Sequence, residues 1–212
     1  MRKYIVDHTN TWKLLAIISS LIAVVALGTF SFQKRQPIIE AIAGNKLFMK
    51  PVSGFTDPSW DTKKELTKFV DRNSLVVGVN VGRANFTANT RQTVFHYTKV
   101  EEVNKVLDKT NELPFPLFTD DSYHNNRLVQ LINGQFICGP TKDSLAYTNH
   151  PIINSYAKSV CTVAVPPGFG DFVGWVNIFL SEEPTYQQME SLRTVAEEMA
   201  RDIYERDVVR RK

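Results

Sequence analysis

The chain has 212 residues, a formal net charge of +3 and a mean hydropathy of −0.20. So small a charge does not favour nucleic acid as a partner, and 13 Phe, 7 Tyr and 3 Trp indicate a packed fold and not a disordered chain. The sequence has no internal repeat and no low-complexity segment. It predicts a single globular domain, for which the roughly 175 residues after position 35 suffice.

The first predicted element is a membrane span over residues 14–32. These nineteen residues carry no charge, and at about 1.5 Å per residue they extend roughly 28 Å, close to the thickness of a bilayer's hydrocarbon core. Small residues at four-residue spacing, Ala16 with Ser20 and Ser19 with Ala23, would let two such helices approach closely. The membrane-spanning positions singled out are Leu14, Ala16, Ser19, Ser20, Ala23, Val24, Gly28 and Phe32.

Two other interpretations of this stretch remain open. A buried core helix is one, although uncharged helices of this length are uncommon in small globular proteins. A cleavable secretory signal is the other, since Arg2, Lys3 and Lys13 form a basic n-region and residues 26–28 resemble a small-residue cleavage site. Against cleavage, the apolar run continues to position 32.

The charges that flank the span do not decide its orientation, because basic residues occur on both sides. Large domains cross membranes largely regardless of charge, so we expect the N-terminus in the cytoplasm and the rest of the chain outside. The predicted organisation is a cytoplasmic tail (1–13), the span (14–32), a juxtamembrane connector (33–54), a globular domain (55–208) and a basic tail (209–212).

The first half of the domain should contain two helices and two strands. The first helix is predicted to start at Pro58, with Thr56 or Asp57 as its cap and Trp60 on its packed side. Alternating residues and a capping box predict strands at 74–81 and 90–98 and a helix that opens at Thr98 and Glu101.

The second half should be dominated by antiparallel pairs. Asn133 and Gly134 predict a tight hairpin between strands at 128–132 and 135–138. A further pair is predicted at 159–165 and 172–180, followed by a helix with a capping box at Thr185 and Gln188. Five or six strands with helices at both ends predict an α+β domain built on an antiparallel sheet with flanking helices. This order of elements resembles PAS- and GAF-type sensor domains.

No recognisable active site is visible in the sequence, so we expect neither an enzyme nor a cofactor. The four histidines (His8, His96, His124 and His150) are scattered and lack metal-ligand spacing. His124 lies in a polar segment, residues 120–126, that could bind a cation, but a solvated loop is the preferred interpretation. Cys161 with His150 as a nucleophile pair lacks any local signature, and a core or disulfide role for Cys161 is preferred.

The two cysteines, Cys138 and Cys161, have 22 residues between them and fall in predicted strands. If those strands are neighbours, a disulfide is plausible and would contribute about 3 kcal/mol by loop closure. Two buried free thiols are the alternative. One disulfide would fit an oxidising compartment.

The C-terminal half contains six short segments that matter together with the topology: residues 131–136 (LINGQF), 153–156 (INSY), 159–161 (SVC), 173–176 (VGWV), 189–192 (MESL) and 200–203 (ARDI). In these segments and in its layout the chain resembles a known family, the holins of T-even bacteriophages. Cys161 matches the family pattern. Cys138 departs from it, because the family's other cysteine lies near the C-terminus.

This resemblance implies a single-pass protein of the host inner membrane with a periplasmic C-terminal domain. Such a protein accumulates as a homo-oligomer in the lipid bilayer and forms timed lesions that release an endolysin. Its periplasmic domain receives a signal from an antiholin protein. The span would then be the working part, and a charge placed at Val24 should abolish the lesions.

The alternative function is a membrane-anchored extracytoplasmic sensor or adaptor that binds a small ligand. The ligand pocket is then expected between the sheet and residues 98–107. A sensor of this type normally signals through a second span or an output module, and we expect none beyond the domain.

Overall fold

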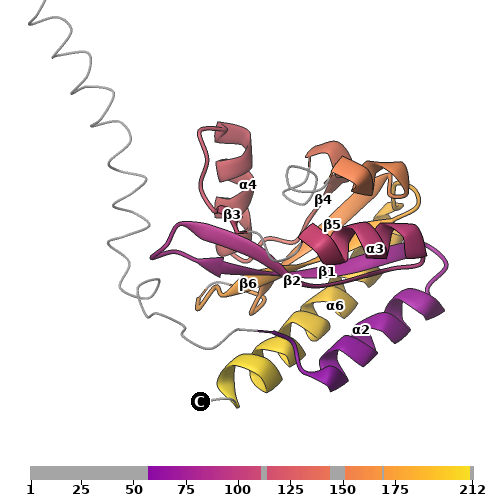
Figure 1. Ribbon diagram of the computed structural model, residues 1–212, viewed down its shortest axis with the longest axis horizontal. Helices are drawn as coiled ribbons and strands as arrows, with labels where there is room; N and C mark the ends of the chain where they lie inside the picture. The colour runs from indigo at the N-terminus through magenta and orange to yellow at the C-terminus, as the bar shows by residue number, and fades with distance from the viewer. Residues whose placement is uncertain (1–56, 111–113, 144–150, 169, 211–212) are drawn as a thin grey trace, which may run out of the picture. The chain divides into compact units, whose positions relative to one another are not determined.

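The computed structural model describes residues 57–110, 114–143, 151–168 and 170–210, all within one compact unit (Figure 1). Within these ranges no helix is both long and apolar enough to cross a membrane. The predicted span at 14–32, with all its singled-out positions, lies outside the described residues, as do the tail at 1–13 and the connector at 33–54.

A six-stranded antiparallel sheet forms the centre of the domain, with the strand order β3-β2-β1-β6-β5-β4. The strands are β1 (Val76–Asn85), β2 (Thr90–Thr98), β3 (Phe115–Pro116), β4 (Ile137–Pro140), β5 (Ser159–Val165) and β6 (Gly174–Leu180). Because the first strand, β1, pairs with the last, β6, the sheet joins the two halves of the chain. The predicted α+β class with an antiparallel sheet and flanking helices is confirmed for the described residues.

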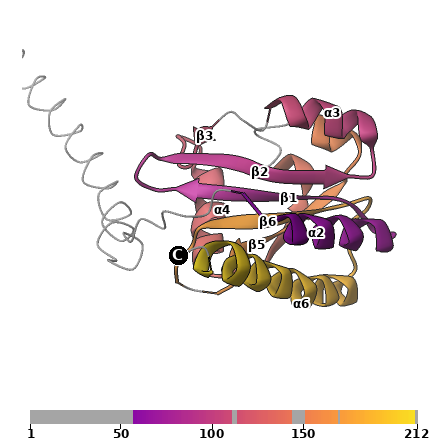
Figure 2. The ribbon, with the colours of Figure 1, turned by 60° about the horizontal axis from the view of Figure 1, so that its bottom comes forward.

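Helices cover both faces of the sheet (Figures 1 and 2). On one face lie α2 (Trp60–Arg72) and α6 (Tyr186–Ile203), which come from opposite ends of the described chain. On the other face lie α3 (Glu101–Thr110) and α4 (Ser122–Ile132). Three shorter helical turns are η1 (Thr141–Asp143), η2 (Pro151–Ser155) and the π-helical η3 (Tyr204–Val209) that continues α6.

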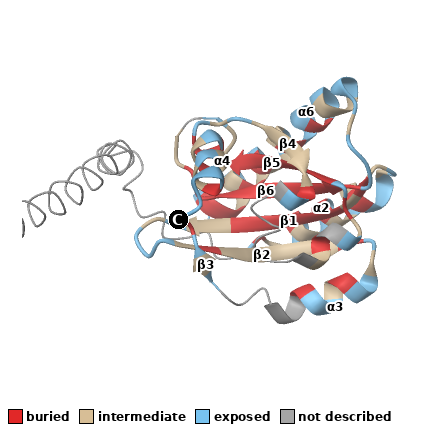
Figure 3. Cartoon of the chain, turned by 90° about the horizontal axis from the view of Figure 1, so that it is seen from above, coloured by how far each residue is buried: buried red, intermediate tan, exposed pale blue. Residues whose placement is uncertain are grey.

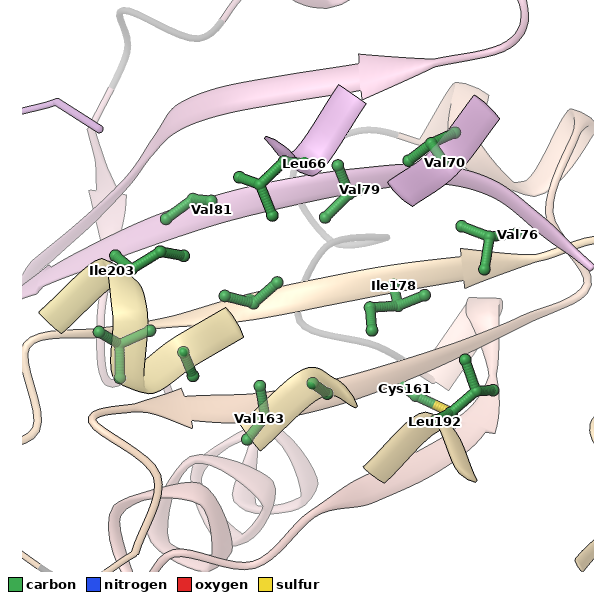
Figure 4. Close-up of a cluster of buried hydrophobic side chains, with 14 of the residues drawn as sticks. Leu66, Val70, Val76, Val79, Val81, Cys161, Val163, Ile178, Leu192 and Ile203 are labelled. Carbon is green, nitrogen blue, oxygen red and sulfur yellow. The ribbon is translucent and has the colours of Figure 1, made fainter. Parts of the chain in front are cut away.

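The main hydrophobic core lies between the sheet and the pair α2 and α6 (Figure 4). Leu66 and Val70 of α2 and Leu192 and Ile203 of α6 contact alternate residues of the strands there. Every residue of β5 and β6 is buried (Figure 3), since helices cover these central strands on both faces.

The predicted hairpin at 128–138 is wrong. Residues 128–132 belong to α4, and Asn133 and Gly134 end that helix. Gly134 has φ 77°, its amide donates to the Leu131 carbonyl at 2.8 Å, and the Gln135 amide donates to the Gln130 carbonyl at 3.0 Å. Such bonds satisfy the last carbonyls of a helix. A positive φ suits a helix end as well as a hairpin turn, so the Asn-Gly pair did not distinguish the two.

The predicted start of the first helix is also displaced. Ser59 is the cap, its Oγ accepts from the Thr62 amide at 3.3 Å, and Pro58 precedes the helix. Trp60 is not on the packed side, since it is 70% exposed. The capping box predicted at Thr98 and Glu101 is wrong as well. The helix α3 begins at Glu101, and the Thr98 amide and carbonyl bond the Asn104 side chain instead.

Other local predictions are confirmed. The strands at 90–98 and 159–165 have their predicted bounds. At the start of α6, the Thr185 hydroxyl accepts from the Gln188 amide and the Gln188 side chain accepts from the Thr185 amide, which is the predicted capping box. A disulfide joins Cys138 of the edge strand β4 to Cys161, which lies directly opposite it on β5.

Candidate ligand-binding site on the sheet

A row of hydrogen-bonded polar side chains crosses three strands on the face covered by α3 and α4. The Thr162 hydroxyl donates to Asn177 Oδ1 at 2.7 Å, and Asn177 Nδ2 donates to Asn80 Oδ1 at 2.8 Å. All three are buried, with exposed fractions of 5%, 1% and 4%. We call Asn80, Thr162 and Asn177 the polar row.

Strand register brings these residues together. Thr162 lies opposite Asn177 in the pairing of β5 with β6, and Asn80 lies opposite Asn177 in the pairing of β1 with β6. The same register places His96 of β2 opposite Asn80. Directly opposite residues on antiparallel strands point to the same face, so the polar row follows from the sheet alignment.

The polar row separates two apolar clusters on this face. On β6, Trp175 lies two residues before Asn177 and Phe179 lies two residues after it, so both point to the same face as Asn177. Trp175 belongs to a cluster with the buried leucines of α4, and Phe179 to a cluster with Ile153 and Val160. Polar groups flanked by apolar surface are typical of small-molecule sites, in which a few hydrogen-bonding groups set the ligand's orientation.

The polar row retains hydrogen-bonding capacity. A side-chain amide nitrogen has two donors, and the Asn80 amide nitrogen makes no hydrogen bond to another described residue. The Tyr156 ring packs edge-on against Phe179, with 6.2 Å between ring centroids. Its buried hydroxyl has no hydrogen-bond partner within the described ranges, and burial raises the pKa of this phenol. The sheet therefore has buried polar groups next to apolar rings.

A second buried polar pair joins β2 to α4. Arg91 is 2% exposed, and its Nη1 lies 3.3 Å from Nδ1 of His124, whose Nε2 lies 3.0 Å from the Leu117 carbonyl oxygen. Burial lowers the pKa of Arg91 to about 10. Burial, and next the charge of Arg91, lower the pKa of His124. A neutral imidazole that donates from Nε2 to the carbonyl can accept from Arg91 at Nδ1.

The predicted solvated loop around His124 is therefore wrong. His124 is buried on α4, and Asp121 caps that helix by accepting from the Tyr123 amide at 2.9 Å. A cation site there is not supported either, since no cluster of His, Cys, Asp or Glu suited to a metal occurs among the described residues. His96 lies on β2, whereas His8 and His150 lie outside the described residues.

The sequence prediction missed the polar row. Asn80 and Asn177 lie in strands that are otherwise apolar, and an amide at an inward position of a buried strand is the signal that could have identified them. The cysteines, by contrast, were singled out from the sequence, and the structure pairs them.

No family model and no curated protein matches the chain. Among solved structures, the GAF domain/HD domain protein from Geobacter sulfurreducens is similar with a TM-score of 0.48 and 13% identity, over 73% of this chain and 96% of that one. A GAF domain of a two-component sensor histidine kinase from Bacillus halodurans gives a TM-score of 0.46 and 14% identity, over 68% and 92%.

A type II free methionine-R-sulfoxide reductase from Thermoplasma acidophilum gives a TM-score of 0.44 and 12% identity, over 70% of this chain and 95% of that one. All three TM-scores are below 0.5. Similarities this distant transfer no ligand, activity or partner to this chain.

Proposed function

We propose that this chain is a single-pass membrane protein whose domain outside the cytoplasm binds a small ligand, as a sensor or adaptor. The observation that carries the proposal is the polar row, buried between two apolar clusters on one face of the sheet. Burying a polar group without a partner costs stability. The Asn80 amide nitrogen and the Tyr156 hydroxyl lack a partner among the described residues, and a role in recognition would account for both.

The chemistry of the polar row indicates the class of ligand. Amide and hydroxyl groups offer donors and acceptors without a formal charge. Trp175 and Phe179 provide aromatic surface on either side of Asn177. A neutral, flat molecule with donors and acceptors along one edge fits these groups best.

The disulfide and the uncharged N-terminal segment both support a domain that lies outside the cytoplasm and is held at a membrane. A disulfide between Cys138 and Cys161 is typical of proteins outside the cytoplasm. The uncharged residues 14–32 would hold the domain at the membrane.

A thermal-shift screen of the full chain in detergent tests the proposal. Neutral heterocycles are compared with charged metabolites, and a ligand should raise the Tm of the wild type. Thr162→Val removes only the hydroxyl of the polar row and should abolish that rise. The matched control is Thr67→Val, because the Thr67 hydroxyl bonds the Lys63 carbonyl of its own helix. A rise that survives Thr162→Val, or a library without any binder, would count against the site.

A holin is the second candidate function, proposed from the resemblance of the short segments to the holins of T-even bacteriophages. Residues 159–161, 173–176 and 200–203 fall on β5, at the start of β6 and at the end of α6, where Cys161, Trp175 and Ile203 are buried. In this function residues 14–32 would form the membrane lesion, and the domain would receive an antiholin.

Induction of the gene in a bacterium together with a cytoplasmic muralytic enzyme separates the two functions. Abrupt lysis after a delay is the result for a holin, and continued growth is the result for a sensor. If the chain is a holin, Val24→Lys should abolish lysis because a central charge opposes membrane insertion by about 3 kcal/mol. Val24→Leu is the apolar control and should lyse normally. Normal lysis with Val24→Lys would refute the holin function.

A further inference from the structure

One stripe of α2 combines an exposed tryptophan with three basic residues. Trp60, Lys64, Lys68 and Arg72 follow one another at four-residue spacing, and all four are exposed. Residues at this spacing lie on one side of a helix. The Lys64 Nζ sits 4.6 Å from the centre of the Trp60 ring, which confirms that the first two are neighbours. We call these four residues the basic stripe.

The basic stripe faces away from the core. Leu66 and Val70 on the other side of α2 are buried in the main core, with exposed fractions of 2% and 0%. Figures 1 and 2 show α2 beside α6 in the layer of helices on one face of the sheet. Nothing in the core therefore requires a Trp or three bases along this side.

The neighbouring acidic residues are partly engaged elsewhere. Arg206 Nη1 lies 3.0 Å from both carboxylate oxygens of Glu65, and Asp71 accepts from the Tyr97 hydroxyl at 2.9 Å. The Arg206 contact offsets the negative charge of Glu65, whereas the neutral Tyr97 hydroxyl leaves the charge of Asp71 in place. Asp61 is exposed on the first turn. The stripe itself remains positive along its length.

A shallow hollow of about 490 Å³ adjoins the far end of the stripe. Lys68 and Arg72 line it together with Phe69, and Glu65 and Asn73 complete its lining. Close by, the Lys99 Nζ donates to the Asn73 carbonyl at 2.7 Å. Cationic groups around an aromatic ring suit an anionic headgroup attached to an apolar body.

We propose that the basic stripe binds the surface of an anionic phospholipid membrane. Tryptophan and basic residues are the side chains that favour the headgroup region of a bilayer. The described chain begins at Asp57, immediately before α2, and the 24 residues 33–56 connect it to the predicted span. This length reaches at most about 80 Å, which allows α2 to lie on the bilayer that the span crosses. The inference rests on the proposed membrane anchor.

A single fluorophore on α2 tests the contact in the full chain. The chain has only two cysteines and both are in the disulfide, so Thr67→Cys provides a unique thiol between Lys64 and Lys68. The protein carrying an environment-sensitive dye is placed in nanodiscs of phosphatidylcholine, alone or with an equal share of phosphatidylglycerol. A spin-labelled headgroup lipid acts as the quencher. Ser122→Cys, exposed on α4 over the opposite face of the sheet, is the control label.

The expected result is strong lipid quenching at position 67 when phosphatidylglycerol is present, and little at position 122. Each change of Lys64, Lys68 or Arg72 to Gln should lower the equilibrium constant for contact of α2 with the membrane surface about fivefold, and the quenching at position 67 should fall accordingly. The control variants each change one of Lys105, Lys142 or Lys158 to Gln, which removes the same single charge from an exposed position away from α2. The dye at position 67 should be quenched in these variants as in the wild type.

Three results would overturn the inference. Equal quenching at positions 67 and 122 would show no preferred face. A dye at 67 that is shielded without lipid quenching would indicate a protein partner. A response to inorganic phosphate without phosphatidylglycerol would indicate a soluble anion. Failure of the chain to enter nanodiscs would instead refute the membrane anchor, and flotation of that chain with phosphatidylglycerol vesicles would then test the stripe alone.

Discussion

Asn177 links the whole polar row, because it bonds Thr162 on one side and Asn80 on the other. It is 1% exposed, so its amide has no access to bulk water. A buried polar group that loses its partner bears the full cost of desolvation, whereas a row replaced throughout by apolar groups does not.

Asn177→Leu should therefore lower the free energy of unfolding by about 1–3 kcal/mol, because Asn80 and Thr162 each lose a partner. The triple variant Asn80→Leu, Thr162→Val, Asn177→Leu should be more stable than the single variant, since it leaves no polar group unbonded. Urea unfolding of the three proteins measures both differences. A triple variant no more stable than the single one would show that the bonds of the row are not what Asn177 contributes.

His124 makes stability depend on pH. Burial and Arg91 hold the pKa of His124 in the folded chain below its usual value, which the unfolded chain retains. At a pH between these two pKa values, the unfolded chain binds a proton that the folded chain does not. The contribution of neutral His124 to the free energy of unfolding is fully present above the ordinary pKa of about 6.5 and is lost as the pH falls below it toward the pKa of the folded chain. The free energy of unfolding should be lower at pH 5 than at pH 7, and His124→Gln should reduce that difference. An unchanged pH dependence in the variant would contradict this.

At the scale of elements, the start of α2 is held by the end of α6. The Asp207 carboxylate in η3 accepts from the Ser59 amide at 3.0 Å and from the Thr62 hydroxyl at 2.9 Å, although 145 residues or more separate them in sequence. A carboxylate at a helix N-terminus satisfies free amides and complements the helix dipole. The two helices that cover one face of the sheet are thereby joined where the chain enters the domain.

Asp207→Ala should cost about 1–3 kcal/mol and loosen the first turn of α2, because it removes the acceptor of two hydrogen bonds, one buried and one partly buried. Amide hydrogen exchange should accelerate at the start of α2 and stay unchanged in β5. Glu205→Ala, at an exposed position of the same turn, is the matched control and should leave exchange at both places as in the wild type. Unaltered exchange in the Asp207 variant would refute this role.

At the scale of the whole molecule, the disulfide fastens one edge of the sheet. β4 has only four residues, and among the described strands it pairs with β5 at one end of the sheet. The bond between Cys138 and Cys161 closes a loop across a sequence separation of 23 residues. Such closure stabilises chiefly by restricting the unfolded chain.

Replacement of both cysteines by Ala should lower the free energy of unfolding by about 3 kcal/mol. Denaturant unfolding of the variant measures this loss, and the wild type treated with a reductant should lose a comparable amount. A variant with an unchanged midpoint would show that the pairing of β4 with β5 is stable without the bond.

Local patterns in the sequence determined several elements by themselves. The strands at 90–98 and 159–165 and the capping box at Thr185 were predictable, because alternation and capping depend on residues near one another in the chain. The antiparallel α+β class also followed from the order of these elements.

Tertiary contacts decided the rest. Residues 128–132 suit a strand or a helix, and the packing of Leu128 and Leu131 in one cluster with Trp175 selects the helix. The polar row needs Asn80 and Asn177, which are 97 residues apart, and the basic stripe became visible only when Leu66 and Val70 fixed the buried side of α2. Local sequence encodes the period of an element, but which face is buried, and which distant side chains meet, depends on the partners that the sheet brings together.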